Sequence, residues 1–282
     1  MDEWSKLFLG RMDDRWYNSL MPQKIILTQQ QEADIRNLYT GGLSAREVAE
    51  QIGLSEKVVA TRLKQWGIRR NWSQAKSKYA FNENAFTSNS PETFYWAGFL
   101  MADGNVWHSK GRQSRTSVSL HIKDRGHLVK FAQFLGMDSE AIYDYSDTKK
   151  SKLTIASNRV AKDLAMFGVV PRKSMIAEVP PERLDVIHSH DFWRGVVDGD
   201  GCIRLARSTY PTFVLVSGSE RFRSQFEDYL KFHDLPLGII TQDFSYTING
   251  AKCLVVIRGL YMNASMYLSR KYNKAMEMLW HE

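Results

Sequence analysis

Two stretches of the chain have nearly the same sequence, and they constrain the fold more than any other feature. The first is Trp96–Val106 (WAGFLMADGNV) and the second is Trp193–Ile203 (WRGVVDGDGCI). Each is a short apolar run with small residues inside it, followed by Asp-Gly and then an apolar residue. This pattern predicts a helix that packs closely against a partner and then leads into a strand. The glycine after the last turn predicts a left-handed helix end.

The aspartates of these stretches, Asp103 and Asp200, are expected at the C-terminal ends of the two helices. The helix macrodipole is negative there, so this end favours cations and disfavours a carboxylate. Two such carboxylates brought together would repel each other further. A divalent cation bound between them would remove the conflict, and the sequence therefore predicts a shared metal site.

Composition limits the class of protein. The chain has 282 residues, of which 43% are hydrophobic, and its formal net charge is +7. This leaves room for one large or several small domains and favours an anionic partner. Two cysteines, Cys202 and Cys253, have no metal-ligand spacing and are too few for a disulfide framework. With no apolar run of membrane-spanning length and an acidic N-terminus, we expect an intracellular, cytoplasmic protein that is neither secreted nor membrane-bound.

Residues 25–70 have the pattern of a small all-α helix-turn-helix domain. Thr28 with Gln31 and Ser44 with Glu47 resemble capping boxes, and Ser55 is expected to cap a third helix. Gly53 lies where the turn between the second and third helices is expected. The alternative interpretation is a three-helix bundle without a DNA-binding role.

Charge favours DNA binding by this domain. Seven basic residues and no acid occur between Lys57 and Lys78, and phosphate neutralisation supplies much of the affinity for DNA. The candidate contacts in this domain are Ser55, Lys57, Thr61, Arg62, Lys64, Arg69 and Arg70. Residues 1–24 form an N-terminal segment to which the sequence assigns no role, and residues 71–92 read as a polar linker.

The rest of the chain reads as one unit present twice, over residues 93–180 and 181–282. In the first copy, strands are expected at 105–108, 115–122, 142–145 and 152–156, with helices at 124–135 and 158–167. In the second copy, strands are expected at 202–206, 212–217, 243–248 and 252–257, with helices at 219–230 and 261–268. The last two strands are expected to form a hairpin around Asn249-Gly250, because this dipeptide is a strong two-residue turn signal.

Spacing supports the duplication. Asp103 and Lys173 lie 70 residues apart, Asp200 and Lys271 lie 71 apart, and an arginine precedes each lysine. The predicted fold class is therefore α+β, a tandem pseudo-twofold repeat of helix-β-β-helix-β-β-helix with two antiparallel sheets that form a saddle, preceded by the helix-turn-helix domain. The two signature helices are expected to cross through small residues at i, i+4 spacing, Gly98 with Ala102 and Gly195 with Gly199.

This arrangement predicts DNA binding and hydrolysis. A concave saddle of strands fits a DNA groove, and two metal-holding carboxylates below a duplex suit phosphodiester hydrolysis. The candidate catalytic residues are Asp103, Asp200, Lys173 and Lys271. The candidate ligands of Mg²⁺, for which Mn²⁺ or Ca²⁺ would substitute in binding, are Asp103 and Asp200 with the backbone of Ala102 and Gly199. The candidate DNA contacts of the repeats are Asn105, Trp107, Arg112, Arg115, Ser117, Ser119, His121, Lys123, Lys152, Arg204, Arg207, Thr212, Lys252 and Arg258.

On the residues of Trp96–Gly104, Trp193–Gly201, Gly168–Ser174 and Arg270-Lys271, the chain resembles the LAGLIDADG homing endonucleases in their single-chain, two-motif form. The resemblance covers roughly residues 93 to 280. It implies a monomeric pseudo-dimer, encoded by a mobile genetic element, that binds a long asymmetric double-stranded DNA site and makes a staggered double-strand cut. It also implies that the last acid of each signature binds metal. The helix-turn-helix domain resembles an added DNA-binding module.

Some positions depart from the family pattern. Met101 stands where the first signature usually has an earlier acid, whereas the second keeps Asp198, an acid that is generally structural. Arg194 replaces a small residue and is expected to turn outward. The polar residue that in the family often organises active-site water would be Asp124 in the first repeat and Ser219 or Glu220 in the second.

Two other functions use the same scaffold. One is a DNA-binding transcriptional regulator on a non-catalytic version of the fold, which loss of the acids or lysines would favour. Both aspartates and both lysines are present here. The other is an RNA-binding maturase that assists intron splicing. An intein is disfavoured, because the ends of the chain lack splicing residues.

Overall fold

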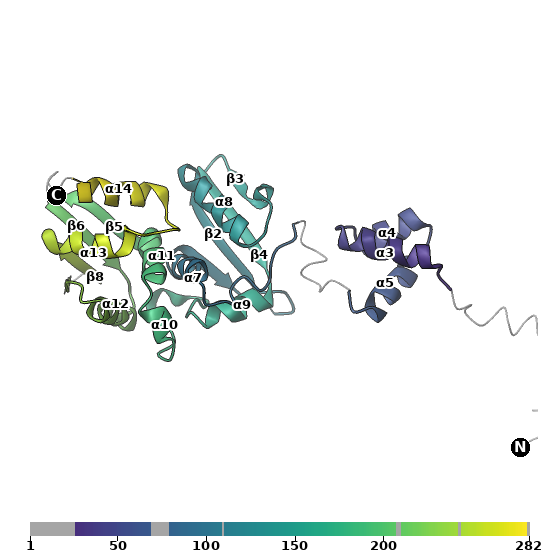
Figure 1. The fold of residues 1–282 in the computed structure, drawn as a ribbon, viewed down its shortest axis with the longest axis horizontal. Helices are drawn as coiled ribbons and strands as arrows, with labels where there is room; N and C mark the ends of the chain where they lie inside the picture. Colours follow the sequence, from purple (N-terminus) through teal and green to yellow (C-terminus); the bar gives the residue numbers. More distant parts are fainter. Residues whose placement is uncertain (1–25, 69–78, 109, 207–209, 242–243, 281–282) are drawn as a thin grey trace, which may run out of the picture. The chain divides into compact units, whose positions relative to one another are not determined.

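The structure of the protein is a computed structural model that describes residues 26–68, 79–108, 110–206, 210–241 and 244–280 (Figure 1). The chain divides into two compact units, residues 1–75 and residues 76–282, and each is described by itself. The predicted N-terminal segment 1–24 and the candidate contacts Arg69, Arg70 and Arg207 lie outside the described residues.

The first unit contains the three predicted helices, α3 (Gln29–Thr40), α4 (Ala45–Ile52) and α5 (Glu56–Gln65). Both predicted capping boxes are present, and Ser55 occupies the N-cap of α5 without a side-chain cap bond. Gly53 ends α4 in the left-handed conformation, which lets the chain turn directly into α5. The helices enclose a small core of Leu27, Ile35, Tyr39, Val48, Ala49, Val59 and Leu63.

The second unit is built around two helices, α7 (Pro91–Asp103) and α11 (His190–Asp200), which pack directly against each other (Figure 1). Both helices are buried over most of their length. They approach closely because a Cβ on Gly98 or Gly195 would overlap the backbone of the opposite helix, and a Cβ on Gly199 would overlap Ala102. The predicted crossing through small residues is thus present.

The predicted left-handed helix ends are wrong. Gly104 and Gly201 follow α7 and α11 with extended φ values of −77° and −73°, and each is already the first residue of a strand. The glycines are needed for space instead. A Cβ on Gly104 would lie 2.8 Å from the Cα of Leu100, and one on Gly201 would lie 2.8 Å from the Cα of Val197.

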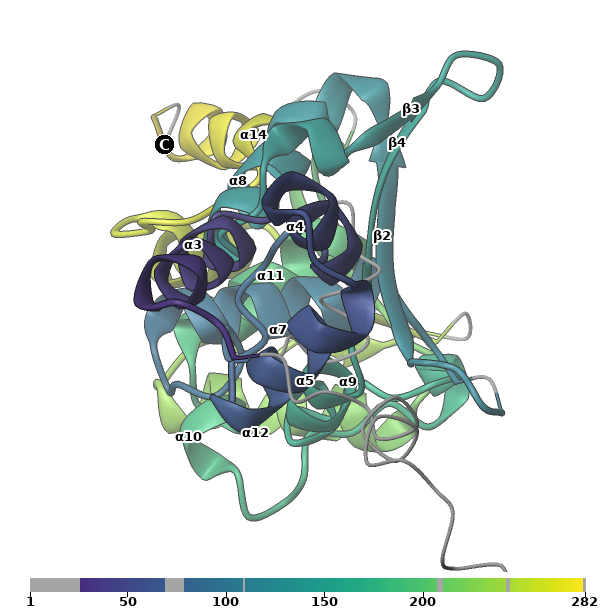
Figure 2. The ribbon, with the colours of Figure 1, turned by 90° about the vertical axis from the view of Figure 1, so that its right-hand side faces the viewer.

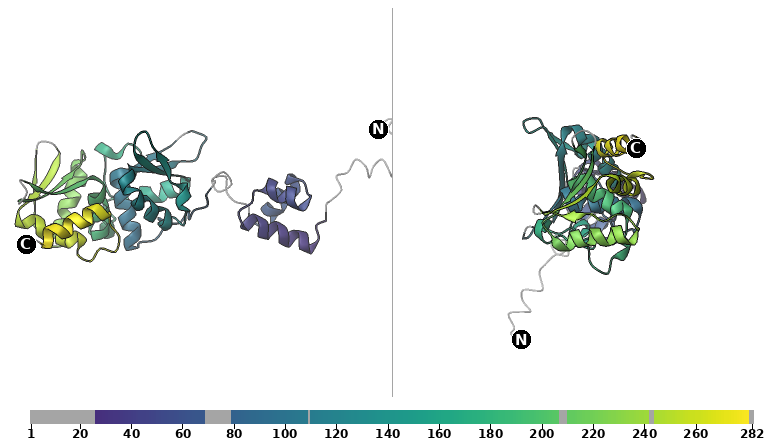
Figure 3. Two further views of the ribbon diagram at one scale, coloured as in Figure 1. Left: turned by 90° about the horizontal axis from the view of Figure 1, so that it is seen from above. Right: turned by 90° about the vertical axis from the view of Figure 1, so that its left-hand side faces the viewer.

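Two four-stranded antiparallel sheets flank the helix pair (Figures 1 and 3). The first has the order β1-β2-β4-β3 and consists of β1 (Gly104–Trp107), β2 (Arg115–His121), β3 (Tyr143–Tyr145) and β4 (Lys150–Ala156). The second has the order β5-β6-β8-β7 and consists of β5 (Gly201–Ala206), β6 (Tyr210–Val216), β7 (Ile239–Ile240) and β8 (Ser245–Asn249). Equal strand order in the two sheets confirms the predicted tandem repeat.

Helices cover one face of each sheet. In the first repeat, α8 (Arg125–Phe134) and α9 (Asn158–Ala165) lie on the same side of β2 and β4 (Figure 2). In the second repeat, α12 (Glu220–Phe232), α13 (Ala251–Tyr261) and α14 (Ser269–Trp280) complete the fold. Short helical segments are η1 (Ile122–Asp124), η2 (Ser139–Ala141), η3 (Lys173–Met175) and α10 (Leu184–Ile187).

The predicted hairpin around Asn249-Gly250 is wrong, because Gly250 leads β8 into helix α13. The residues predicted as strand 252–257 lie in this helix, whose buried side chains are Cys253, Leu254, Val256, Ile257, Leu260 and Tyr261. That spacing is helical, and it outweighs the β-branched residues. The predicted helix 261–268 is also displaced, since α13 ends at Tyr261 and α14 begins at Ser269.

Part of the predicted linker 71–92 is packed. Ala85 and Phe86 are buried in the core of the second unit, and the rings of Phe86 and Phe134 lie 5.2 Å apart. Ser90 then caps α7 by accepting a hydrogen bond from the backbone N–H of Thr93. None of the helices in the described ranges has the length and apolar character needed to cross a membrane.

Candidate active site

Helices α7 and α11 bring their terminal aspartates to the same end of the helix pair. A Cβ on Gly199 would lie 3.4 Å from the backbone nitrogen of Asp103 and 3.5 Å from its Cγ. Asp103 therefore lies against the last turn of α11, next to Asp200. The structure thus brings together the two carboxylates that the sequence analysis singled out.

These two carboxylates are electrostatically unsatisfied. Neither Asp103 nor Asp200 has a hydrogen-bond or ion-pair partner among the residues that the structure describes. Partial burial, together with the charge of Asp200, raises the pKa of Asp103 to about 6. Burial also raises the pKa of Asp200, while Lys173 and Lys271 act against that shift. Two like charges held this close favour a bound cation.

Lys271 lies at the C-terminal end of α11. Its ammonium donates hydrogen bonds to the backbone oxygens of Val197 (2.6 Å), Gly199 (3.1 Å) and Gly201 (2.6 Å). The side chain is only 7% exposed, and burial lowers the pKa of this lysine to about 8. A cation is favourable at this helix end, where carbonyl groups lack intrahelical partners.

Lys173 has the related position beside α7, with fewer contacts. Its ammonium donates a hydrogen bond to the backbone oxygen of Gly104. Burial lowers the pKa of Lys173, while Asp200 and Asp103 act against that shift. Both lysines that the repeat spacing identified therefore lie at the aspartate end of the helix pair.

The charge of each lysine reaches the aspartate of the other repeat. Of the two lysines, Lys271 of the second repeat lowers the pKa of Asp103 more strongly, whereas Lys173 of the first repeat has the stronger effect on Asp200. Both lysines therefore act on both aspartates, so residues of the two repeats contribute to one composite site.

The three residues considered for organising water have different surroundings. Asp124 accepts a hydrogen bond of 2.8 Å from Nε of Arg270, so it joins the group around Lys271. Ser219 caps α12 and donates a hydrogen bond of 2.6 Å to the backbone oxygen of Ala177, which occupies its hydroxyl. Glu220 is exposed in the first turn of α12.

The donor set fits Mg²⁺. This ion takes hard oxygen ligands and is often held by one or two carboxylates, with water and substrate phosphate completing its coordination. Asp103 and Asp200 supply the carboxylates, and the backbone oxygen of Gly199 is shared with Lys271. Among the described residues, no group of three or more His, Cys, Asp or Glu side chains could hold a metal ion. A hollow of about 220 Å³ lies beside Asp200 and Lys173.

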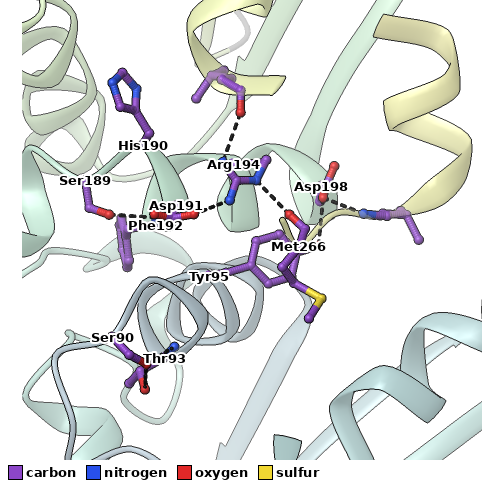
Figure 4. Close-up of polar contacts among 12 residues, drawn as sticks. Ser90, Thr93, Tyr95, Ser189, His190, Asp191, Phe192, Arg194, Asp198 and Met266 are labelled. Carbon is purple, nitrogen blue, oxygen red and sulfur yellow. Dashed lines mark hydrogen bonds and ion pairs between the residues drawn. The ribbon is translucent and has the colours of Figure 1, made fainter. Parts of the chain in front are cut away.

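Asp198 is structural, as the resemblance implies. It is fully buried and accepts hydrogen bonds of 2.7 Å from Tyr95 Oη and the backbone N–H of Leu268 (Figure 4). Tyr261 Oη donates a third hydrogen bond of 2.7 Å to this carboxylate. Burial raises the pKa of Asp198, and these three donors act against that shift. Tyr95 belongs to the first repeat, so this carboxylate joins the two repeats.

Arg194 does not turn outward, and that prediction is wrong. The side chain is 3% exposed and donates to the backbone oxygens of Met266 (2.7 Å) and Leu260 (3.0 Å) and to Asp191 (Figure 4). The roles of Arg194, Tyr95 and Tyr261 were missed. A long cation in an otherwise small and apolar helix signature was the available signal, since a charge there needs buried partners.

The first sheet carries a polar and aromatic face opposite its helices. Strand register places Asn105 beside Ser117, Trp107 beside Arg115, and Ser119 beside Lys152 on one face. A hollow of about 460 Å³ on this face is lined by Asn105, Trp107, Arg115, Ser117, Ala141, Tyr143, Tyr145, Lys152 and Thr154. His121 ends β2, Lys123 lies in η1, and Arg112 lies in the turn between β1 and β2; all three are exposed.

Fewer of the candidate DNA contacts of the second repeat lie on the strand face of its sheet. Arg204 is paired with Thr212 on one face, and Arg204 is exposed whereas Thr212 is buried. Lys252 and Arg258 do not lie on a strand, because both belong to α13. The predicted placement of Lys252 on a strand is therefore wrong. In the first unit, Ser55, Lys57, Thr61 and Lys64 are exposed on or next to α5, and Arg62 donates a hydrogen bond of 3.1 Å to Gln65.

No family model and no curated protein matches the chain. The chain is similar to the solved structure of the LAGLIDADG meganuclease I-AabMI bound to uncleaved DNA, with 15% identity, a TM-score of 0.47, and coverage of 68% of this chain and 90% of that one. The LAGLIDADG homing endonuclease I-LtrWI bound to its target DNA has 10% identity, a TM-score of 0.45 and the same coverage. I-SmaMI, bound to uncleaved DNA in the presence of calcium ions, has 16% identity, a TM-score of 0.42, and coverage of 67% and 89%. The first two of these solved structures are described as LAGLIDADG enzymes, which is the family that the two signatures of this chain resemble.

Proposed function

We propose that the protein is a site-specific DNA endonuclease that hydrolyses one phosphodiester bond on each strand with divalent metal held by Asp103 and Asp200. The single observation that carries this proposal is the meeting of two unpartnered, repeat-related carboxylates beside buried Lys271 and partly buried Lys173. A purely structural carboxylate such as Asp198 is instead surrounded by donors.

The symmetry of the site suits a double-stranded substrate. The two strands of a duplex are related by local two-fold axes, and a protein with two-fold symmetry presents equivalent groups to both strands. The two repeats provide equivalent aspartates, lysines and sheets within one chain. Because the side chains of the two sheets differ, an asymmetric DNA site and a monomeric pseudo-dimer follow from the proposal.

The chain contributes charge and position to the chemistry. Asp103 and Asp200 would hold Mg²⁺, which stabilises the negative charge that develops on the reacting phosphate. Lys271 keeps its proton at neutral pH, since its pKa is about 8, and three carbonyl bonds fix its ammonium. Lys173 supplies the second positive charge beside Asp200. Fixed positive charges near a reacting phosphate lower the barrier without reorganising during the reaction.

The sheet faces and the first unit would supply binding. Arg115 and Lys152 offer phosphate contacts, and Asn105, Ser117 and Ser119 offer hydrogen bonds to base edges. Exposed Lys57, Thr61 and Lys64 on α5 make this helix the candidate for insertion into a major groove, as the second helix of helix-turn-helix domains does. This module would extend the recognised site.

Selection from a randomised duplex library tests the proposal. We expect the wild type to cut a narrow set of sequences on both strands with Mg²⁺, to bind them without cutting with Ca²⁺, and to leave them intact with a chelator. Asp103→Asn and Asp200→Asn are expected to bind the selected duplex and to lose cleavage. Asp228→Asn is the matched control, because Asp228 is exposed on α12 and should cut like the wild type.

The alternatives give different results in the same experiment. Tight and specific duplex binding by the wild type, with no cleavage in Mg²⁺ or Mn²⁺, would establish a regulator. Preferential binding of structured intron RNA over the duplex would establish a maturase. Either result rejects the endonuclease.

A further inference from the structure

The segment that connects α13 to α14 is held by two side chains of α11, one helical turn apart. Arg194 donates hydrogen bonds to the backbone oxygens of Leu260 and Met266, and Asp198 accepts one from the backbone N–H of Leu268 (Figure 4). These bonds reach the last turn of α13 and then Met266 and Leu268 in the connection 262–268, whose seven residues have no regular secondary structure beyond turns. Their position is therefore set by α11.

Arg194 is a costly residue to bury unless its donors are satisfied. Besides the two backbone oxygens, its guanidinium contacts the Asp191 carboxylate and lies 5.7 Å from the centre of the Tyr95 ring. The planar fork of arginine fixes these directions together, and a lysine could not reproduce them. The Arg194 side chain therefore holds the connecting segment at a fixed position relative to α11.

The connecting segment leads into the first turn of α14, which carries Lys271. The backbone oxygen of Leu268 accepts hydrogen bonds from the backbone N–H groups of Lys271 (2.9 Å) and Tyr272 (3.0 Å), which starts α14. Fixing Leu268 therefore fixes the first turn of this helix. Lys271 leaves that turn to reach its three carbonyl oxygens, and Arg270 leaves it to pair with Asp124.

The first repeat lacks this device. Aligning the signatures by Trp96 and Trp193 places Ala97 opposite Arg194 and Met101 opposite Asp198. Neither side chain can donate or accept the corresponding hydrogen bonds. Among the described residues, Lys173 is held through one backbone oxygen, whereas Lys271 is held through three.

We propose that Arg194 is a positioning residue that holds Lys271 for reaction with one DNA strand, so that the two strands are cut by unequally prepared halves of the site. This inference rests on the proposed endonuclease function. The pseudo-twofold assigns one lysine to each strand, and Arg194 acts on only one of them. Its loss should therefore impair one cut and spare the other.

The test uses full-length protein and a duplex selected by the wild type, with a different fluorophore on each strand. Single-turnover rates are measured for both strands in the wild type, Arg194→Met, Lys271→Met and Lys173→Met. Arg194→Met is expected to slow one strand by about 10- to 100-fold, the cost of misplacing a reacting group slightly. It should be the strand that Lys271→Met slows, while Lys173→Met slows the other, and nicked duplex should accumulate.

Controls separate positioning from loss of structure. Thermal unfolding and duplex affinity in Ca²⁺ are measured for each variant, and Arg194→Gln replaces Arg194→Met if the latter fails to fold. Arg194→Lys is expected to restore little of the lost rate, because it lacks the planar fork. Equal slowing of both strands, or unchanged rates on both, would overturn the inference. Failure of the wild type to cut any duplex would instead remove the proposed function, and this inference with it.

Discussion

Gly98 of α7 lies directly against the backbone oxygen of Phe192 in α11, with no room for a side chain between them. Gly195 makes the reciprocal contact, since a Cβ there would lie 2.7 Å from the backbone nitrogen of Phe99 and closer still to Tyr95. Because these neighbours are backbone atoms, they cannot move aside as a flexible side chain would. The distance between the helices, and with it the spacing of Asp103 and Asp200, depends on these glycines.

Replacing Gly98 or Gly195, at the contact between α7 and α11, should destabilise the second unit. We expect Gly98→Ala and Gly195→Ala each to lower the free energy of unfolding by about 1–3 kcal/mol or more, the usual cost of overpacking a core. Urea denaturation measures this change through the midpoint at constant m-value. Gly126→Ala is the control, because Gly126 lies in α8 with nothing within 4 Å of its Cβ position. Gly126→Ala should be neutral or stabilising. Equal losses of unfolding free energy in all three variants would contradict the tight contact between α7 and α11.

The two facing carboxylates predict an unusual response to metal. Without metal, Asp103→Asn should raise the melting temperature, because it removes repulsion from Asp200. With Ca²⁺ at about 100 times its dissociation constant, the wild type should gain about 2.7 kcal/mol, and Asp103→Asn should gain much less. Differential scanning calorimetry with Ca²⁺ and with a chelator measures both the effect of Asp103→Asn on the melting temperature and the stabilisation by Ca²⁺. A variant that is destabilised in chelator and still stabilised by Ca²⁺ would show that Asp103 is not a ligand.

His127 predicts a stability change in acid. Burial, followed by the charges of Lys130 and Arg270, lowers the pKa of this histidine to about 3. Its Nε2 lies 3.0 Å from Tyr95 Oη, and its buried Nδ1 has no partner in the described structure. The unfolded chain binds this proton near the ordinary pKa of about 6.5, so stability falls as the pH drops from there towards 3.

The measurement is a comparison of the wild type with His127→Gln, which cannot titrate. The wild type should lose up to about 1.4 kcal/mol per pH unit more than the variant across this window. Urea denaturation at several pH values gives the difference. Parallel pH profiles of the two proteins would show that the pKa of His127 is the same in the folded and unfolded states.

Much of the fold could be predicted because the two halves of the chain can be compared with each other. The two signatures and the matched spacing to Lys173 and Lys271 fixed the order of elements, and Gly98, Gly195 and Gly199 indicated a close helix crossing. Such features depend on residues close in sequence or on direct comparison of the two halves. They need no knowledge of the third dimension.

The errors occur where long-range contacts decide. Asn249-Gly250 is a turn signal in isolation, yet the apolar face of 251–261 packs as a helix against the core. Arg194 appeared too polar for the seam, but its partners Leu260 and Met266 lie more than sixty residues away along the chain. Local pattern cannot reveal a carbonyl group that only the folded chain supplies.

The two sheet faces differ in charge, which predicts unequal contributions to DNA affinity. On the face opposite the helices, the first sheet carries Arg115, Lys150 and Lys152, whereas Arg204 is the described cation on the corresponding face of the second sheet. Each phosphate contact lowers the slope of log K against log salt by about 0.9. Arg115→Gln and Lys152→Gln should each reduce the magnitude of the slope by about that amount, and the double variant by about twice it.

Fluorescence anisotropy of the selected duplex in Ca²⁺, at several salt concentrations, measures these slopes without cleavage. Lys162→Gln is the matched control, because Lys162 is exposed on α9, which covers the other face of the same sheet. Its slope should equal that of the wild type, since a lysine on the helical side is too far from the duplex to release a counterion. If Lys162→Gln reduces the magnitude of the slope as much as Lys152→Gln, the duplex does not lie on the strand face, because both sides of the sheet would then contribute equally.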